Sequence, residues 1–148
     1  MNDSGVHLIP ILIDDREKLP WALSVNQFST DRKRLVTGDY TIVGYEETVA
    51  IERKSLGDFV GTVIHDWIRF RKELKRLSSY DTAAIVVEAN VEDVLSHKYD
   101  SEAAPLSVMG RAHGIFLDHG VPVFFWGPRL QSLRMAEQFL WLTWKRLL

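Results

Sequence analysis

One aspartate and one Glu-Arg-Lys triplet in the first half of the chain have the residue types needed for metal-assisted chemistry. Asp39 follows a glycine, and Glu52, Arg53 and Lys54 end an apolar run further along. Carboxylate oxygens are ligands that hard divalent cations prefer, and an ammonium beside them can stabilise developing negative charge. The grouping therefore suits a divalent metal with a cation next to it.

Hydrolysis of a phosphodiester would give each of these groups a separate role. We predict that Asp39 and Glu52 bind Mg²⁺ or Mn²⁺, with the backbone carbonyl of Arg53 as a third oxygen ligand. Lys54 would orient the attacking water or neutralise charge that builds on the phosphate. Asp58 is placed to tune Lys54 or to reach the metal through a water. Taken alone the spacing is a weak signal, because strands often carry surface charges and ion pairs of this kind.

A second charged group, Asp14-Asp15-Arg16-Glu17, directly follows an apolar run. Ligands commonly bind at strand ends in open α/β sheets. Glu17 is placed to join the acidic cluster, at a second metal position. Arg16 is suited either to grip a phosphate or to pair with one of the carboxylates.

The elements that must position these residues can be predicted from hydrophobic periodicity. A turn-forming segment at 44–47 separates two apolar-leaning runs, so 38–54 is predicted to form a hairpin in which Glu52 and Lys54 share one face and Arg53 faces the other. The run from Val6 to Ile13 predicts a buried strand, although Pro10 indicates an edge position or a later start. Residues 20–34 are predicted to be loop with at most one short segment.

Helices and strands alternate further along the chain. Ser55 and Asp58 have the spacing of a helix N-terminal capping box, and apolar residues at helical spacing then continue to Leu77. Strands are predicted at 83–89 and 121–126, and helices at 91–96, 105–119 and 128–148. The pattern predicts an α/β protein with a central mixed sheet flanked by about three helices.

The helix that follows Asp58 also carries a basic face, interrupted only by Glu73. Such faces are commonly just solvated, but the position directly after the carboxylates favours contact with a polyanion. Its basic residues are Arg69, Arg71, Lys72, Lys75 and Arg76.

Length and composition limit the class of protein. A chain of 148 residues is most simply a single domain, 1–148, and its net charge of -2 means that nucleic-acid binding would need a local basic patch. The absence of cysteine excludes disulfides and thiolate metal sites. With neither a signal peptide nor a membrane-length apolar run, we expect an intracellular protein with no membrane contact, cytoplasmic in a prokaryote or virus and nuclear in a eukaryote.

The complete sequence motif is more specific than any of its parts. Gly38-Asp39-Tyr40, then E-R-K-x-x-x-D from Glu52 to Asp58, preceded by Asp14-x-Arg16-Glu17, resembles the nuclease domain of the XPF and Hef family of structure-specific DNA endonucleases. The resemblance runs from about Ile11 to Leu140. It implies a restriction-endonuclease-like, PD-(D/E)XK, nuclease core. It also implies a metal-dependent endonuclease that cuts DNA near flaps, forks or bubbles in repair or recombination.

The resemblance also implies roles for individual residues. Arg69 matches a basic position close to the site, and we expect Arg53 and the basic helix face to contact DNA. Family members usually carry a tandem helix-hairpin-helix module and a helicase domain, and we expect neither in this chain. The family's active-site positions correspond to Asp14, Arg16, Glu17, Asp39, Glu52, Arg53, Lys54 and Asp58.

Two other functions fit the same residues. The chain could be a non-catalytic nuclease-like subunit that binds DNA or a partner, or an enzyme that acts on RNA or on a specific duplex sequence. The last helix carries more apolar residues, among them Met135, Trp141 and Leu142, than a one-sided surface helix requires. Because the family pairs its nuclease domains, we expect a homodimer or heterodimer through this C-terminal helix.

Overall fold

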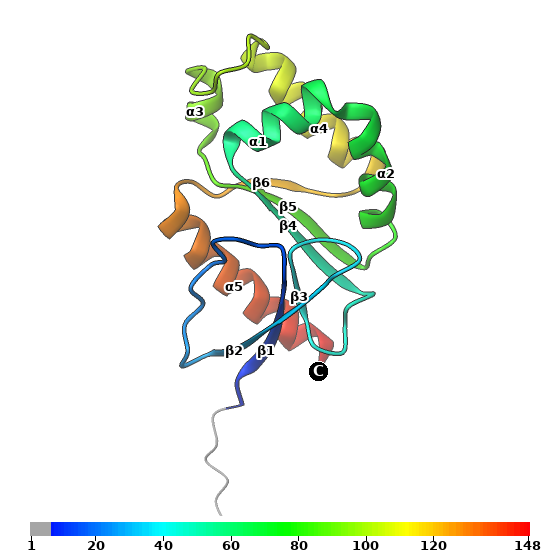
Figure 1. Ribbon diagram of the computed structural model, residues 1–148, viewed down its shortest axis with the longest axis vertical. Helices are drawn as coiled ribbons and strands as arrows, with labels where there is room; N and C mark the ends of the chain where they lie inside the picture. The colour runs from blue at the N-terminus through cyan, green and yellow to red at the C-terminus, as the bar shows by residue number, and fades with distance from the viewer. Residues whose placement is uncertain (1–6) are drawn as a thin grey trace, which may run out of the picture.

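The structure of the protein is a computed structural model, and the residues that it describes are 7–148. In this part of the chain six strands form one sheet in the order β2-β1-β3-β4-β5-β6 (Figure 1). Neighbouring strands are parallel except at β1–β3 and β3–β4. The sheet is therefore mixed, as predicted. Its strands are β1 (Ile9–Asp14), β2 (Phe28–Lys33), β3 (Tyr40–Ile42), β4 (Val49–Lys54), β5 (Thr82–Val87) and β6 (Val123–Phe125).

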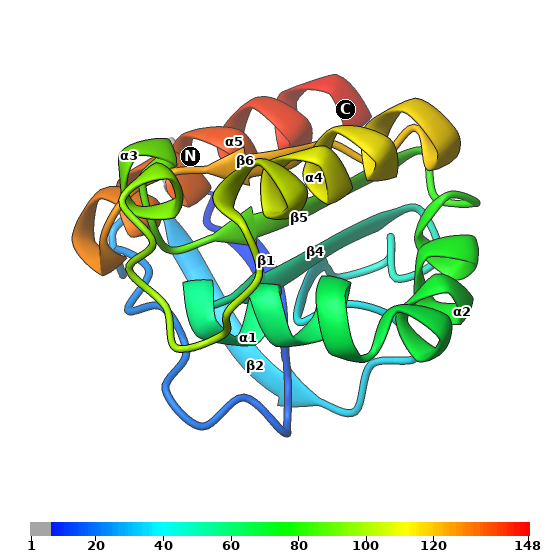
Figure 2. The same cartoon turned by 90° about the horizontal axis from the view of Figure 1, so that it is seen from above.

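Helices cover both faces of this sheet, which completes the predicted α/β architecture. Figure 2 shows α1 (Leu56–Val60) and α5 (Arg129–Leu147) on opposite sides of the strands. α2 (Trp67–Leu77) and α4 (Pro105–His119) pack on the same side as α1, and α3 (Val91–Leu95) is a short helix after β5. None of the helices formed by residues 7–148 has the length and apolar character needed to cross a membrane.

Two hydrophobic cores follow from the alternation of side chains along the central strands. Ala50 of β4 packs with α1, α2 and α4, whereas Ile51 packs with β1, β3 and α5. Fully burying one such aliphatic side chain contributes about 1.5–3 kcal/mol, so each strand is held firmly in register. The same alternation directs Glu52 toward α2 and Arg53 toward α5.

Of the two alternatives that Pro10 indicated, the edge position was wrong, because β1 lies between β2 and β3. The strand does start later than Val6, at Ile9, although it still includes Pro10. Pro10 is tolerated because β3 pairs only with Ile11 to Ile13, beyond the residue that lacks an N–H. The predicted first residue of this strand, Val6, lies outside the described residues.

The segment predicted to be mainly loop contains the six-residue strand β2. Only Phe28 of this strand is buried, and the other residues are exposed and polar. An edge strand of this kind has no apolar alternation, which is why periodicity missed it.

The helical segment after β4 is also divided, although its apolar stripe predicted one continuous helix. Ser55 caps α1 as predicted, with its hydroxyl accepting the Asp58 N–H at 3.2 Å. A π-helix, η1 (Gly61–His65), follows α1, and α2 starts after Asp66, whose backbone leaves the helical region. The β-branched run Thr62-Val63-Ile64 has low helix propensity, which favours this interruption.

Candidate functional site

A polar cleft of about 430 Å³ lies where the residues that end β1 and precede β3 face helix α2. It contains most of the residues that we predicted for catalysis and metal binding. The residues that line it are Asp14, Arg16, Glu17, Val36, Gly38, Asp39, Glu52, Arg69, Lys72, Glu73 and Arg76.

Gly38 allows the backbone to bring Asp39 into this cleft. Its φ of +78° belongs to the left-handed region, and an added Cβ would lie 3.2 Å from both the Ala50 Cβ and the Ile51 carbonyl oxygen. The Asp39 N–H donates to that Ile51 carbonyl at 2.7 Å, while the Asp39 carbonyl accepts the Asp14 N–H at 2.8 Å. Asp39 is therefore fixed by hydrogen bonds to both β4 and the end of β1.

The carboxyl groups of Asp39 and Glu52 form a hydrogen-bonded acidic pair. Asp39 Oδ2 also accepts the Arg53 N–H at 2.8 Å, and the Arg53 carbonyl faces the same edge of β4 as that N–H. Burial raises the pKa of Asp39 to about 6, with a smaller contribution from the charge of Glu17, against the lowering effect of the Arg53 N–H. Burial, followed by the neighbouring Asp39 and Glu73, raises the pKa of Glu52 well above its usual range.

These oxygens suit a hard divalent cation that retains several waters. In residues 7–148 no group of three or more His, Cys, Asp or Glu side chains is arranged around a common metal position. Asp39, Glu52 and the Arg53 carbonyl provide two carboxylates and one carbonyl, a donor set that fits Mg²⁺ or Mn²⁺. A bound cation would also favour the ionised forms of two carboxyls that burial disfavours.

Lys54 places its ammonium next to this pair. Its Nζ lies 3.8 Å from Glu52 Oε1 and 5.4 Å from the centre of the Phe70 ring. The contact with Glu52 shows that the two side chains share one face of β4, as the strand alternation predicted.

Asp14 and Arg16 pair with each other at the other end of the cleft. The Arg16 guanidinium donates to both Asp14 carboxylate oxygens, at 2.8 and 3.1 Å, and Asp14 also accepts the Leu35 N–H at 2.9 Å. Burial raises the pKa of Asp14, but these hydrogen bonds outweigh it and hold the pKa below its usual value. Of the two roles predicted for Arg16, the structure shows the pairing with a carboxylate.

Glu17 lies at the lip of the cleft and Asp58 lies outside it. Glu17 Oε2 accepts hydrogen bonds from Arg53 Nη1 at 2.9 Å and from the Tyr40 hydroxyl at 3.1 Å. Asp58 is exposed in the first turn of α1 and does not line the cleft. The predicted contribution of Asp58 thus remains a prediction without a contact that supports it.

Helix α2 forms the opposite wall and divides the predicted basic face into two groups. Arg69, Lys72 and Arg76, the cleft-facing basic set, line the cleft, whereas Arg71 and Lys75, the outward pair, are exposed and do not line it. The cleft-facing side chains have the i, i+3 and i+7 spacing of one helix face.

Glu73 is a site residue that we missed. In the sequence it only interrupts the basic face, but in the structure its carboxyl lines the cleft and interacts with Glu52, whose pKa it helps to raise. The signal was present in the sequence, because Glu73 stands four residues after Arg69 and so shares its helix face.

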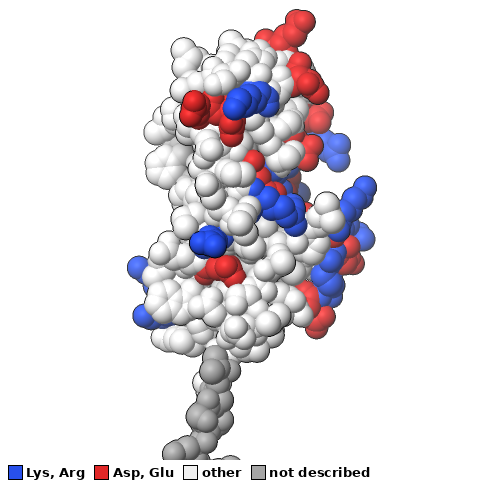
Figure 3. Space-filling model, turned by 90° about the vertical axis from the view of Figure 1, so that its left-hand side faces the viewer, with Lys and Arg blue, Asp and Glu red and all other residues white. Residues whose placement is uncertain are grey.

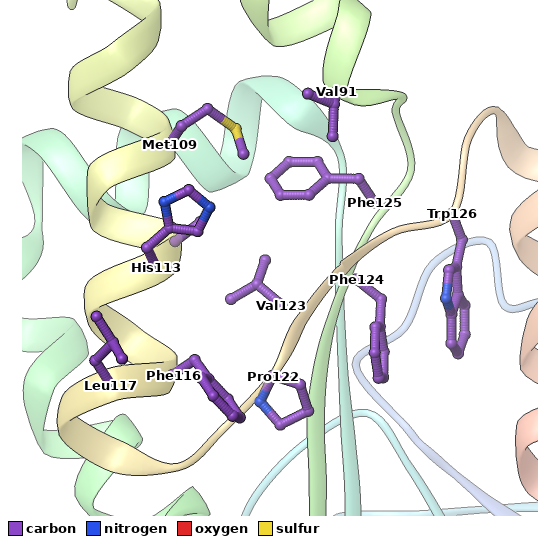
Figure 4. A pocket seen from close by; sticks show the side chains of 11 residues that line it. Val91, Met109, His113, Phe116, Leu117, Pro122, Val123, Phe124, Phe125 and Trp126 are labelled. Atoms are coloured by element: carbon purple, nitrogen blue, oxygen red, sulfur yellow. The ribbon is translucent and has the colours of Figure 1, made fainter.

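Charged side chains on the face shown in Figure 3 do not form a single basic surface. Basic and acidic side chains are interspersed there, and uncharged residues cover most of the area. A second hollow of about 620 Å³ lies between α4 and β6 (Figure 4). Its lining is almost wholly apolar, and His113 is the one lining side chain that could take part in acid-base chemistry or bind a metal.

Comparison with known proteins identifies the family and the fold. Residues 13–139 match the family profile of the ERCC4 domain. The fold resembles that of XPF from Aeropyrum pernix, with a TM-score of 0.74 and 22% sequence identity over 93% of this chain and 66% of that one.

A structure of XPF from Aeropyrum pernix in complex with DNA has a TM-score of 0.70 and 20% identity, with the same coverage. No curated protein matches the sequence. This chain thus spans slightly less than two thirds of the Aeropyrum protein. The match to the ERCC4 profile extends over most of the length of this chain. The chain belongs to the ERCC4 domain family, the XPF family that its sequence motif resembles.

Proposed function

We propose that this chain is a divalent-metal-dependent endonuclease that hydrolyses phosphodiester bonds in branched DNA, such as flaps and forks. The observation that carries the proposal is the acidic pair of half-buried Asp39 and buried Glu52 beside the Lys54 ammonium, with the cleft-facing basic set on the far wall of the cleft that these two acids line. Acidic oxygens for a cation and basic groups for a phosphate thus face each other across one opening.

The residues divide the reaction between them. Asp39, Glu52 and the Arg53 carbonyl would hold Mg²⁺ or Mn²⁺, which supplies positive charge to the phosphate and to the attacking water. Lys54 Nζ, 3.8 Å from Glu52, orients that water and offsets charge that develops on the phosphate. Hydrolysis adds the elements of water across one P–O bond and leaves a phosphate monoester and a hydroxyl.

DNA is the preferred substrate because a DNA complex is known for XPF from Aeropyrum pernix. In this chain, the net charge of -2 gives no general attraction to a polyanion. Binding therefore depends on the cleft-facing basic set and on further contacts from a partner or from other parts of a longer protein. We propose that the DNA bound in this way is a substrate of repair or recombination inside the cell.

Cleavage assays with labelled fork, flap and duplex DNA test this function. We expect Mg²⁺- or Mn²⁺-dependent cleavage by the wild type, loss of at least a hundredfold in rate for Asp39→Asn and Lys54→Ala, and near-normal cleavage by Lys75→Ala, which lies off the cleft. A wild-type protein that cuts none of these substrates but still binds a second nuclease-like subunit would favour the non-catalytic alternative.

We also propose that the chain pairs with a second subunit through α5. The predicted apolar stripe of this helix is divided between two environments. Leu140 is buried against the sheet, whereas Met135, Trp141 and Leu142 are between 37% and 42% exposed. Those exposed apolar side chains leave area available for a homodimer or heterodimer contact.

A further inference from the structure

Arg53 stands between Glu52 and Lys54, but its side chain enters a separate network on the other face of β4. Its Nε donates to Glu88 Oε1 at 2.6 Å, and its Nη1 donates to Glu17 Oε2 at 2.9 Å and to the Leu19 carbonyl at 2.6 Å. The guanidinium also lies 5.6 Å from the centre of the buried Trp21 ring. The fork geometry of arginine allows one side chain to hold both carboxylates at once.

This network leaves little of the Arg53 side chain accessible to a DNA molecule. Its side chain is 12% exposed, compared with 11% for Glu88 and 18% for Glu17. Two acidic partners already neutralise its charge, and strand alternation points it away from Glu52 and Lys54. The arrangement favours a positioning role over the DNA contact that we predicted for Arg53.

The backbone of the same residue reaches the acidic pair. Its N–H donates to Asp39 Oδ2 at 2.8 Å, so Arg53 joins Asp39 through its main chain and Glu17 through its side chain. Tyr40 directly follows Asp39 in the sequence, and its hydroxyl is the second donor to Glu17. Glu17 is thus fixed by the two residues next to the proposed metal ligands.

We propose that Arg53 is a positioning residue, which uses Glu88 as a brace to hold the Glu17 carboxylate at the lip of the cleft, where it contributes to binding the divalent cation. This inference rests on the proposed function, because it requires a cation in the cleft. Glu17 lines the cleft and its charge acts on Asp39, which shows that its carboxylate is within electrostatic reach of the acidic pair. Groups that orient a ligand in this way typically change metal affinity 10- to 100-fold when mutated.

The loop that carries Glu17 has other supports, which makes the side-chain clamp separable from the fold of the loop. The Arg129 guanidinium donates to the Leu19 and Pro20 carbonyls, at 2.6 and 2.9 Å. Arg32 donates to the Asp15 and Glu17 carbonyls. The bonds from Arg129 and Arg32 hold only the backbone of the loop. Arg53 shares the Leu19 carbonyl with Arg129, but it also holds the Glu17 carboxylate, as does Tyr40.

The test measures Mn²⁺ binding to the DNA-free protein by calorimetry, together with DNA affinity in EDTA. Arg53→Lys keeps the charge but loses the fork, and we expect Mn²⁺ affinity to fall about tenfold while DNA affinity stays unchanged. Glu17→Gln should weaken Mn²⁺ binding similarly, and the double variant should be no worse than Glu17→Gln alone, because the arginine acts through that carboxylate. Arg129→Gln is the matched control, since it loosens the same loop but spares the clamp, and it should bind Mn²⁺ like the wild type.

Several outcomes would overturn the positioning role. Additive effects of Arg53→Lys and Glu17→Gln would show that the arginine acts independently of Glu17, and a loss of DNA affinity in Arg53→Lys would show that it contacts DNA. Equal losses of Mn²⁺ affinity in Arg129→Gln and Arg53→Lys would assign the effect to the loop as a whole. These results leave the proposed nuclease intact if the wild type cuts DNA, whereas a wild type that neither binds Mn²⁺ nor cuts DNA would overturn both proposals.

Discussion

Replacing Asp39 by asparagine should stabilise the metal-free protein while it abolishes cleavage. Asp39 is half-buried beside Glu52, and partial burial is the chief cause that raises the pKa of its carboxyl from 3.8 to about 6. The folded protein therefore holds a proton on Asp39 at pH values where the unfolded chain has released it. Stability from this residue is present below pH 4 and is lost as the pH rises through about 6.

The size of this effect follows from the shift in pKa. A shift from 3.8 to about 6 corresponds to about 3 kcal/mol of lost stability once Asp39 is ionised. Asparagine removes the buried charge, accepts the Arg53 N–H with its carbonyl and donates to Glu52 with its amide. Because the amide makes weaker hydrogen bonds than a carboxylate, we expect a net gain of about 2 kcal/mol at pH 7.5, or roughly 4–8 °C in Tm.

Thermal unfolding in EDTA across pH 4 to 8 measures this difference. The free energy of unfolding of Asp39→Asn relative to the wild type should rise from near zero at pH 4 to about 2 kcal/mol at pH 7.5. Asp118→Asn, an exposed position on α4, should stay within about 0.5 kcal/mol of the wild type. Mg²⁺ should then raise the Tm of the wild type but not of Asp39→Asn. A difference that does not change with pH would refute the claim that ionised Asp39 destabilises the fold.

Three further predictions concern other parts of the site. Alanine substitution of the cleft-facing basic set should weaken DNA binding and reduce the slope of log affinity against log salt by about one per lost phosphate contact. Alanine substitution of the outward pair should change neither the affinity nor the slope. Titration by fluorescence anisotropy measures both quantities. Gly38→Ala should destabilise the protein by about 1–3 kcal/mol in urea unfolding, because it strains a left-handed backbone pressed against β4. Trp141→Glu should shift a concentration-dependent dimer toward the 17.0 kDa monomer in sedimentation, and a wild type that is monomeric at high concentration would contradict the dimer.

Much of the candidate site could be predicted from the sequence because it depends on short-range geometry. Strand alternation placed Glu52 and Lys54 on one face of β4, and their contact at 3.8 Å agrees with this. The cap at Ser55 and the stop at Gly120, whose φ is +70°, follow from local hydrogen bonding and backbone freedom. Such features are set within a few residues and need no knowledge of tertiary packing.

Features that depend on tertiary packing could not be predicted in this way. The partnership of Glu52 with Glu73 requires knowing that α2 packs over the end of β4, and the clamp on Glu17 joins residues far apart in the chain. Strand β2 was missed because an exposed edge strand bears no apolar pattern. The burial of Trp21, which stacks on Tyr40 at 4.6 Å between ring centres, likewise depends on tertiary packing.

The order Glu-Arg-Lys in β4 has a physical reason in the pleat of the strand. Glu52 lines the cleft and Lys54 contacts it from the same face of β4, so the residue between them must face α5, where it meets Glu17 and Glu88. An arginine at that place neutralises both of those acids and directs its N–H to Asp39. A shift of β4 by one residue would turn Arg53 toward α2 and would turn Glu52 and Lys54 toward α5. The register of one strand therefore couples the chemistry on one face to the clamp on the other.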